Sequence, residues 1–299
     1  MGEYKPKKDG MRRFRCAHSG LIVNGKMLGG SVVCPRVSLL REHGIQAPID
    51  DRAKATFAIG HVNEQLFKDS VEKTGKDFQE EDVFIFDVDP EVELIMAADF
   101  IVEGVPYELK SVSSTRAYKK IFIEGNYKVE NMAQLVQEMI ELERPMGVLR
   151  YTNFVYHSEY KKPDLRTMKS LARKVGKATD LAEANELGKQ MASMIAETWK
   201  AAAGQVKRFV IRIDEEGNIL VDGKKSGYHV SHVLEHRQVT IDCLKHNQVY
   251  HTRPAEVDGF SPCNLCSWAD ACDKFDGQFI STTEEFLNEA KKALTIKPE

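Results

Sequence analysis

The spacing of hydrophobic positions divides the chain into alternating helical and extended segments. Apolar residues recur at helical spacing over 34–44 and, after an Asp-Asp capping signal, over 51–67, which predicts two helices. The pattern becomes that of strands over 83–112, is helical again over 132–142, and returns to a strand over 147–156. This order of helix, hairpin, helix and strand predicts an α/β fold with a mixed central sheet flanked by helices.

The second half of the chain has its own sequence of patterns. Residues 158–205 are strongly helical in composition and read as an insertion, and a hairpin over 208–222 and a helix near 229–245 follow. Ser281 opens a last amphipathic helix with a capping box. We therefore divide the chain into a basic, irregular N-terminal arm over 1–30, a main domain over 31–275 that contains the insertion, and a C-terminal helix over 276–299.

Charge and hydropathy narrow the class of protein. The 299 residues contain 42 Lys and Arg against 45 Asp and Glu, so the net charge of -3 gives no global attraction to a polyanion, and any nucleic acid must be held by local basic patches. No apolar run is long enough for a membrane span, and the first residues lack the apolar stretch of a secretory signal. We expect a cytoplasmic protein that contacts no membrane.

Two carboxylates and a lysine meet on one predicted hairpin. If Glu103-Gly104 is a two-residue loop, the register pairs Asp99 with Glu108, and alternation places Lys110 on the same face as Glu108. Like charges among apolar strands are costly unless a cation lies between them, and oxygen ligands of this kind suit Mg²⁺ or Mn²⁺. Taken alone, the pattern also describes an edge hairpin with solvated charges.

The neighbouring helices add two residues to this pattern. His61, in Gly60-His61, precedes the hairpin, and Gln134 follows it on the next helix. With Asp99 and Glu108-Leu109-Lys110 between them, the chain resembles the PD-(D/E)XK nuclease superfamily, in particular its RecB-like branch. The family's last motif is Q-x3-Y, and this chain departs from it because Glu138 occupies the place of the Tyr.

The resemblance implies a role for each matching residue. His61, Asp99, Glu108 and the backbone carbonyl of Leu109 would be metal ligands. Lys110 would be the catalytic lysine, and Gln134 would orient the lysine or the substrate. The bound ion would activate a water and offset the charge that develops on a phosphodiester during attack.

Six cysteines in a reducing compartment point to ligation rather than to disulfides. Cys263, Cys266 and Cys272 form a C-x2-C-x5-C motif, and the fourth ligand is Cys34 or, less favoured, Cys16, while Cys243 reads as a packed helix residue. Spacing alone fits zinc and an iron-sulfur cluster equally. The motif order resembles the iron-sulfur subset of RecB-like nucleases: the CRISPR-associated exonuclease family (the fourth Cas protein) and the nuclease domain of AddB. That resemblance implies a 4Fe-4S cluster on Cys34, Cys263, Cys266 and Cys272 that joins the N- and C-terminal segments.

Two basic segments are candidates for DNA contacts, although such segments are usually solvated surface. One directly follows the catalytic strand, and the other opens the insertion. Their candidate residues are Arg116, Tyr118, Lys119 and Lys120 in the first, and Tyr160, Lys161, Lys162, Arg166, Lys169 and Arg173 in the second.

Two other motifs are weaker. The segment 20–27 resembles a P-loop but has Met27 after its lysine, so it lacks the hydroxyl that would hold Mg²⁺. His229, His232 and His236 share a helix face, for which a polar surface is a better reading than a second metal site.

The sequence therefore predicts a Mg²⁺- or Mn²⁺-dependent DNA exonuclease that prefers single-stranded ends and acts in recombination, repair or end processing. One alternative is a CRISPR-type nuclease that trims prespacer ends within a larger assembly, and another is a non-catalytic, zinc-stabilised nucleic-acid-binding module. A helicase, an annealing protein or a CRISPR adaptation protein would be the partner besides DNA. The resemblance also allows a homo-oligomer, which no sequence feature specifies.

Overall fold

The computed structural model describes residues 10–30, 33–45, 51–80, 83–155, 205–248, 254–255 and 283–296, and single residues within 170–190 and 263–272. Within these residues the chain is a mixed α/β protein, as the alternating patterns predict. The largest sheet has seven strands. In spatial order they are β12 (Lys224–His229), β11 (Asn218–Val221), β10 (Val206–Ile213), β9 (Met146–Asn153), β8 (Val105–Val112), β7 (Phe100–Val102) and β4 (Phe78–Glu80).

The parallel pair of β8 and β9 lies near the middle of this sheet, and every other neighbouring pair is antiparallel. Side chains alternate along a strand, so β8 sends Glu108, Lys110 and Val112 to one face and Tyr107 and Leu109 to the other. Glu108 and Lys110 therefore share one face of the sheet.

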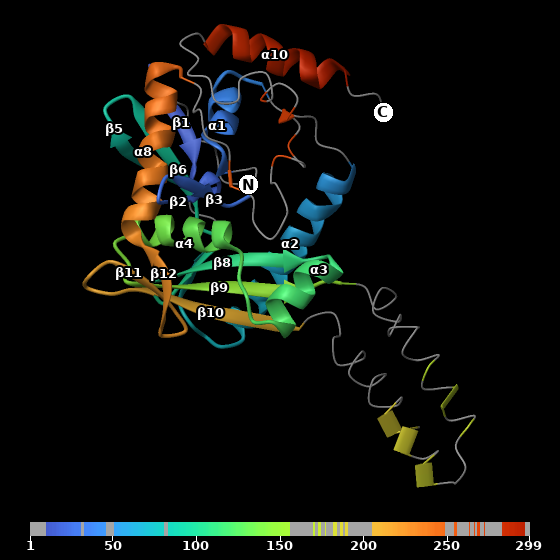
Figure 1. Cartoon of the computed structure of the whole chain (residues 1–299). Helices are drawn as coiled ribbons and strands as arrows, with labels where there is room; N and C mark the ends of the chain where they lie inside the picture. The colour runs from blue at the N-terminus through green and yellow to red at the C-terminus, as the bar shows by residue number, and fades with distance from the viewer. Residues whose placement is uncertain are drawn as a thin grey trace.

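Helix α4 (Val129–Glu141) covers the face that carries Glu108 and Lys110 (Figure 1). Its apolar stripe, including Met132, Leu135 and Met139, is buried against β9 and β10. Gly147 on β9 permits this close approach, since a Cβ added there would lie 2.9 Å from Leu135 Cδ1. The polar residues that α4 turns toward β8 are therefore held close to the sheet.

Helix α2 (Asp51–Glu72) packs on the opposite face. Phe67 contacts Phe100 and Tyr107, with ring centroids 4.9 Å and 5.2 Å apart. The guanidinium of Arg150, which lies beside Leu109 in the parallel register, stacks over the Phe67 ring at 5.0 Å. The C-terminal half of α2 is thus fixed against β7, β8 and β9.

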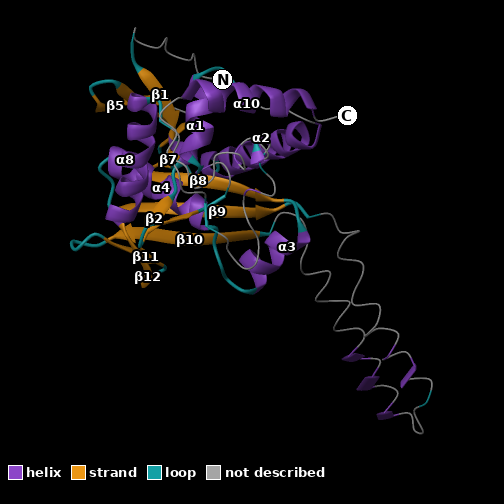
Figure 2. Cartoon of the chain, turned by 45° about the horizontal axis from the view of Figure 1, so that its top comes forward, coloured by secondary structure: helices purple, strands orange, loops and turns teal. Residues whose placement is uncertain are grey.

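A second layer of structure lies beside the main sheet. A three-stranded sheet of β1 (Arg12–Arg15), β6 (Val92–Ala97) and β5 (Val83–Asp89) packs with helices α1 (Pro35–Glu42), α8 (Val230–His246) and α10 (Thr283–Ile296). Their shared core includes Phe14, Leu39, Leu94, Leu244 and Phe286. Figure 2 shows these helices gathered on one side of the long strands β8, β9 and β10. Segments from both ends of the chain meet in this layer.

The basic N-terminal segment differs from the irregular arm that its composition suggests. From residue 12 onward it forms β1, a 3-10 turn η1 (Cys16–His18) and a hairpin of β2 (Leu21–Val23) and β3 (Lys26–Leu28). Strand β1 pairs in parallel with β6, and Arg13 forms a 2.5 Å ion pair with the buried carboxylate of Glu93. Arg12 and Arg13 have partners within the fold, because the segment completes a sheet whose other strands lie far away in the sequence. The P-loop-like segment is the β2–β3 hairpin.

Within the strands predicted over 83–112, the apolar run over 93–102 that leads into the Glu103-Gly104 turn is not one strand. The chain breaks at Ala98 and Asp99 into β6 and β7, which belong to different sheets. Continuous hydrophobicity did not reveal the break, because both halves are buried in their own sheets. As a result, Asp99 lies at the junction between the two layers.

The remaining elements follow the predicted order. Helices α1, α2, α4 and α8, strand β9 and the β10–β11 hairpin lie where the pattern placed them. Most of the predicted insertion over 158–205, and the cap at Ser281, fall outside the described residues. In the part of the chain that is described, none of the helices is both long and apolar enough to cross a membrane.

Candidate active site

The β7–β8 hairpin has the predicted turn and register. Glu103 and Gly104 both have positive φ, 50° and 78°, as a two-residue type I′ turn requires. Val102 pairs with Val105, and Phe100 pairs with Tyr107. Asp99 directly precedes Phe100, which is the first residue of β7 and the paired residue farthest from the turn. The hairpin thereby brings Asp99 to the level of Glu108 and Leu109.

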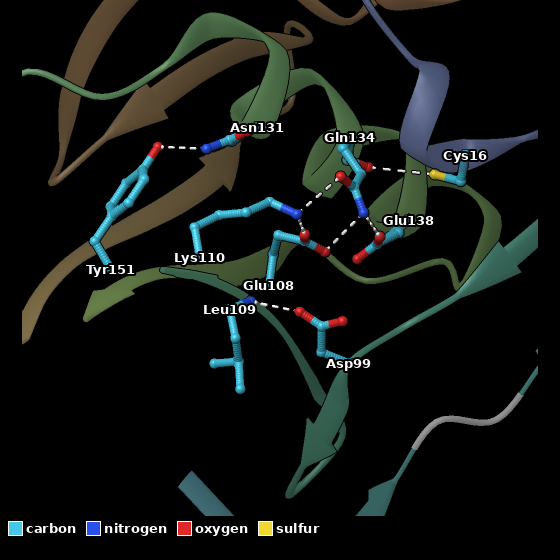
Figure 3. A network of polar contacts seen from close by, with 9 residues as sticks. All are labelled: Cys16, Asp99, Glu108, Leu109, Lys110, Asn131, Gln134, Glu138 and Tyr151. Atoms are coloured by element: carbon cyan, nitrogen blue, oxygen red, sulfur yellow. Dashed lines mark hydrogen bonds and ion pairs between the residues drawn. The ribbon is translucent and has the colours of Figure 1, made fainter. Parts of the chain in front are cut away.

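Asp99 is hydrogen-bonded to β8 at the edge that β7 leaves unpaired. Its Oδ2 accepts a hydrogen bond of 2.7 Å from the backbone N–H of Leu109 (Figure 3). The N–H and C=O of one strand residue point to the same side of the strand. The carbonyl of Leu109 therefore faces the same edge of β8 as its N–H, the edge at which β7 no longer pairs with β8. An aspartate carboxylate and a backbone carbonyl therefore share this edge.

The side-chain amide of Gln134 joins the polar groups on the α4 face. Its Nε2 donates to Glu108 Oε2 at 2.9 Å and to Glu138 Oε1 at 3.1 Å, and its Oε1 accepts from Lys110 Nζ at 3.3 Å. Lys110 Nζ also forms an ion pair with Glu108 Oε1. Each donor and acceptor of the amide has a partner, so its orientation is determined (Figure 3).

This network contains more negative than positive groups. Asp99, Glu108 and Glu138 surround a single ammonium group, and Glu108 and Glu138 have no exposed surface. Burial, and then the charge of Glu108, raises the pKa of Asp99 and of Glu138 well above the usual carboxylate range. Burial lowers the pKa of Lys110, but attraction to Glu108 and Asp99 outweighs it and raises the net pKa. Lys110 therefore stays charged, while Asp99 and Glu138 favour an added proton or cation.

The structure does not bring His61 into this network. The side chain lies on α2, is 72% exposed, and its Nδ1 lies 3.1 Å from Glu64 Oε2. The charge of Glu64 contributes to the raised pKa of Asp99. Glu64 is thus the α2 residue whose charge reaches the site, and a ligand role for His61 stays a prediction.

The residues present fit a divalent cation by their chemistry. Glu138 Oε2 is fully buried and has no hydrogen-bond partner within the described residues, and the clustered carboxylates supply the hard oxygen donors that Mg²⁺ and Mn²⁺ prefer. In the described parts of the chain, no three His, Cys, Asp or Glu side chains form a ready-made coordination group. Binding would therefore require small movements of these side chains.

The four favoured cysteines line one narrow cavity of about 20 Å³, at the N-terminal end of α1. None of the four forms a disulfide bond. Burial, and then the neighbouring Cys272, raises the pKa of Cys34 to about 12, and Arg36 opposes this shift. Arg36 and Trp268 also line the cavity, and the buried Trp268 Nε1 has no hydrogen-bond partner among the residues described. Thiols beside a cation and a spare N–H donor suit an anionic thiolate cluster by their chemistry. The described cysteines do not form a ready-made coordination group, so binding of a cluster would require movements of this lining.

Cys16, the rival ligand, lies elsewhere. Its side chain is 1% exposed, and its Sγ donates to the backbone carbonyl of Gln134 at 3.5 Å. Burial, and then the charge of Glu138, raises the pKa of Cys16. Cys16 therefore packs behind the carboxylate network rather than in the four-cysteine cavity. Cys243 is buried on α8, as predicted.

The three α8 histidines serve the fold in two ways. His229 and His232 form a reciprocal cap at the start of the helix. His236 is buried, and its ring nitrogens bond the backbone N–H of Gly20 and the carbonyl of Val33. The expected polar surface is therefore wrong for His236, which instead connects α8 to the N-terminal segment.

The predicted DNA contacts divide by exposure. Tyr118, on α3 (Thr115–Tyr118), is 5% exposed and stacks on Phe122, so it is part of the core and cannot stack on a base. Arg116 is exposed, as is Lys119 in the π-helical turn η3 (Lys119–Ile123), whereas Lys120 is half-buried. Arg173 is also exposed. Tyr160, Lys161, Lys162, Arg166 and Lys169 lie outside the described residues.

Two acidic residues of the site escaped the sequence prediction. Glu138 was noted only as a departure from the Q-x3-Y motif, although its spacing from Gln134 predicts a shared helix face. Glu64 lies three residues after His61, and the rotation of α2 about its axis decides which of them faces Asp99.

Comparison of the sequence with protein-family models finds no matching family, and comparison with curated proteins finds no matching relative.

Proposed function

We propose that this protein is a divalent-metal-dependent deoxyribonuclease that removes nucleotides from single-stranded DNA ends, with the PD-(D/E)XK type of fold and site. The observation that carries the proposal is the polar network of Figure 3, in which Asp99 and Glu108 meet a lysine that Gln134 holds in place. The predicted roles of the hairpin residues require this arrangement.

Asp99, Glu108 and the carbonyl of Leu109 would hold the ion, with Glu64 or His61 approaching from α2. A bound Mg²⁺ or Mn²⁺ would supply an activated water and offset the charge on the phosphodiester. Lys110 donates its N–H groups toward the attacking water or a phosphate oxygen, and its raised pKa keeps it cationic throughout the neutral range. Gln134 aims the lysine, and Asp99 and Glu138, whose pKa values are raised, would give up their protons when a cation binds.

Cys34, Cys263, Cys266 and Cys272 would hold a 4Fe-4S cluster, whose role is structural because it joins α1 to the segment near the C-terminus. Zinc on the same thiols is the alternative for the cofactor. This arrangement is compatible with a protein that processes DNA ends by itself, or together with a helicase, an annealing protein or the CRISPR adaptation machinery.

The proposal is tested with end-labelled single- and double-stranded oligonucleotides, incubated with Mn²⁺, with Mg²⁺ and with EDTA. We expect stepwise shortening of the single strand that EDTA abolishes. Cleavage that persists in EDTA, or ion-dependent binding without any cleavage of either substrate, would contradict a metal-dependent nuclease and favour the non-catalytic module.

A further inference from the structure

A polar cavity of about 150 Å³ lies beside the carboxylate network. It opens where β8 ends, between α3 and the start of α4, and Lys110 forms part of its wall. Figure 3 shows Tyr151 and Asn131 on one side of Lys110 and the carboxylates on the other. The lysine thus separates the proposed metal-binding edge from this second space.

The wall of the cavity is rich in hydrogen-bond donors. Tyr151 Oη accepts from the backbone N–H of Lys128 at 3.1 Å and from Asn131 Nδ2 at 2.9 Å. A phenol that accepts two hydrogen bonds still has its own proton to donate, and Tyr151 has no acceptor for it among the described residues. The side chain is 1% exposed, so this proton is a buried donor without a partner.

The charge of the lining is positive. Lys110 and Lys128 contribute to the wall, together with the polar residues Ser113, Ser114, Asn131 and Tyr151, and none of the described Asp or Glu residues lines it. Lys128 is exposed and makes no ion pair with any residue that the structure describes. Lys110 is already paired with Glu108, so Lys128 and the neutral donors of the wall are the groups that favour an anion. A cavity of about 150 Å³ is also large enough for one six-membered ring, and therefore for a phosphate group, but not for a nucleotide.

We propose that this cavity binds a phosphate group of the DNA strand that neighbours the scissile phosphate, an inference that rests on the proposed nuclease function. Lys128 and the hydroxyl of Tyr151 are the specificity-determining groups. The same chemistry would accept a terminal phosphate monoester or an internal phosphodiester, and the position of the recognised phosphate sets how far from the end the strand is cut.

Binding of internally labelled single strands is measured in EDTA, where no cleavage occurs. One series carries a phosphate or a hydroxyl at each end, and the other carries one neutral methylphosphonate at each internal linkage in turn. We expect wild-type protein to bind strands that keep the recognised phosphate charged about tenfold more tightly. The series that shows this difference identifies the terminal or the internal source.

Lys128→Met and Tyr151→Phe test whether the cavity is responsible. Lys128→Met changes an exposed side chain and should remove most of the preference for the charged strand. Lys224→Met, which changes an exposed lysine on the edge strand β12 that does not line the cavity, should keep it. If both cavity variants weaken binding to charged and neutral strands equally, or leave it unchanged, the proposal is overturned.

A parallel assay with Mn²⁺ separates this inference from the proposed function. Cleavage without any phosphate preference would contradict the proposed phosphate site and would support the proposed nuclease function. A phosphate preference that depends on Lys128, in a protein that does not cleave DNA, would support the phosphate site and contradict the proposed nuclease function.

Discussion

Gln134 fixes the geometry of the site although it carries no charge. Its amide donates to Glu108 and Glu138 and accepts from Lys110. Lysine side chains are long and rotatable, so an acceptor that holds the ammonium group lowers the entropy cost of placing it. We regard Gln134 as a positioning residue in this respect.

Gln134→Ala should lower kcat on the order of tenfold and leave KM for DNA nearly unchanged, because the lysine loses its orientation but DNA contacts are kept. The matched control is Gln137→Ala on the same helix, which is also buried but bonds Glu141 instead. Equal losses of kcat in both variants would show that the effect is general damage to α4.

The buried carboxylates predict how stability depends on pH. Burial, and then repulsion from Glu108, raises the pKa of Asp99 and of Glu138, so the folded state binds these protons more tightly than the unfolded state. The free energy of unfolding in EDTA should therefore fall as pH rises from about 4 toward the raised values. Mn²⁺ should offset this fall, because it replaces the protons.

Denaturant titrations across this pH range measure the effect. Glu138→Gln should make the dependence shallower, and Glu143→Gln, which changes an exposed carboxylate on the loop after α4, should not. A slope that Glu138→Gln leaves unchanged would exclude Glu138 from the network.

At the residue scale, sequence reasoning found the residues whose positions a short turn determines. The Glu103-Gly104 turn fixes which residues of β7 and β8 are opposite, so Asp99 and Glu108 could be paired in advance. Glu138, Glu64 and Tyr151 could not, because their inclusion depends on how α4, α2 and β9 are placed in three dimensions.

At the scale of elements, the β7–β8 hairpin and its turn position both carboxylates. Gly104 has a φ of 78°, and a Cβ there would meet only Arg144 Cζ at 3.9 Å. Gly104→Ala should therefore lower the free energy of unfolding by about 1 kcal/mol through backbone strain rather than through a clash.

Gly60→Ala is the matched comparison in chemical denaturation. Gly60 lies inside α2, and a Cβ added there would meet only open space. That substitution should stabilise the protein by about 1 kcal/mol, because alanine is the better helix former. Equal destabilisation by both changes would contradict the assigned turn.

The spacing of hydrophobic positions predicted most of the helices and strands. It failed for strands whose hydrogen-bonded partner strand is remote in the sequence. β1 joins β6 across about eighty residues, and nothing local in Arg12–Arg15 indicates a strand within a sheet. The break at Ala98 was hidden for a related reason, since β6 and β7 are both buried and read as one apolar run.

At the scale of the whole molecule, the four-cysteine cavity connects α1 with the segment before α10. Protein purified without oxygen should be brown and contain about four iron atoms per chain. Cys34→Ser should lose the iron and lower the melting temperature, while Cys16→Ser and Cys243→Ser should keep the iron, because both thiols lie outside the cavity. A colourless wild-type protein with stoichiometric zinc would replace the cluster by zinc.

The central claim is that Asp99, Glu108 and Lys110 form a hydrolytic centre. The most direct test is the single-turnover rate of Mn²⁺-dependent cleavage of a single-stranded end by Lys110→Met. Lys76→Met, which removes an exposed lysine that pairs with Glu103 at the turn of the same hairpin, is the control. We expect a loss of at least about a hundredfold for Lys110→Met and wild-type cleavage for Lys76→Met. Undiminished cleavage by Lys110→Met would contradict the central claim.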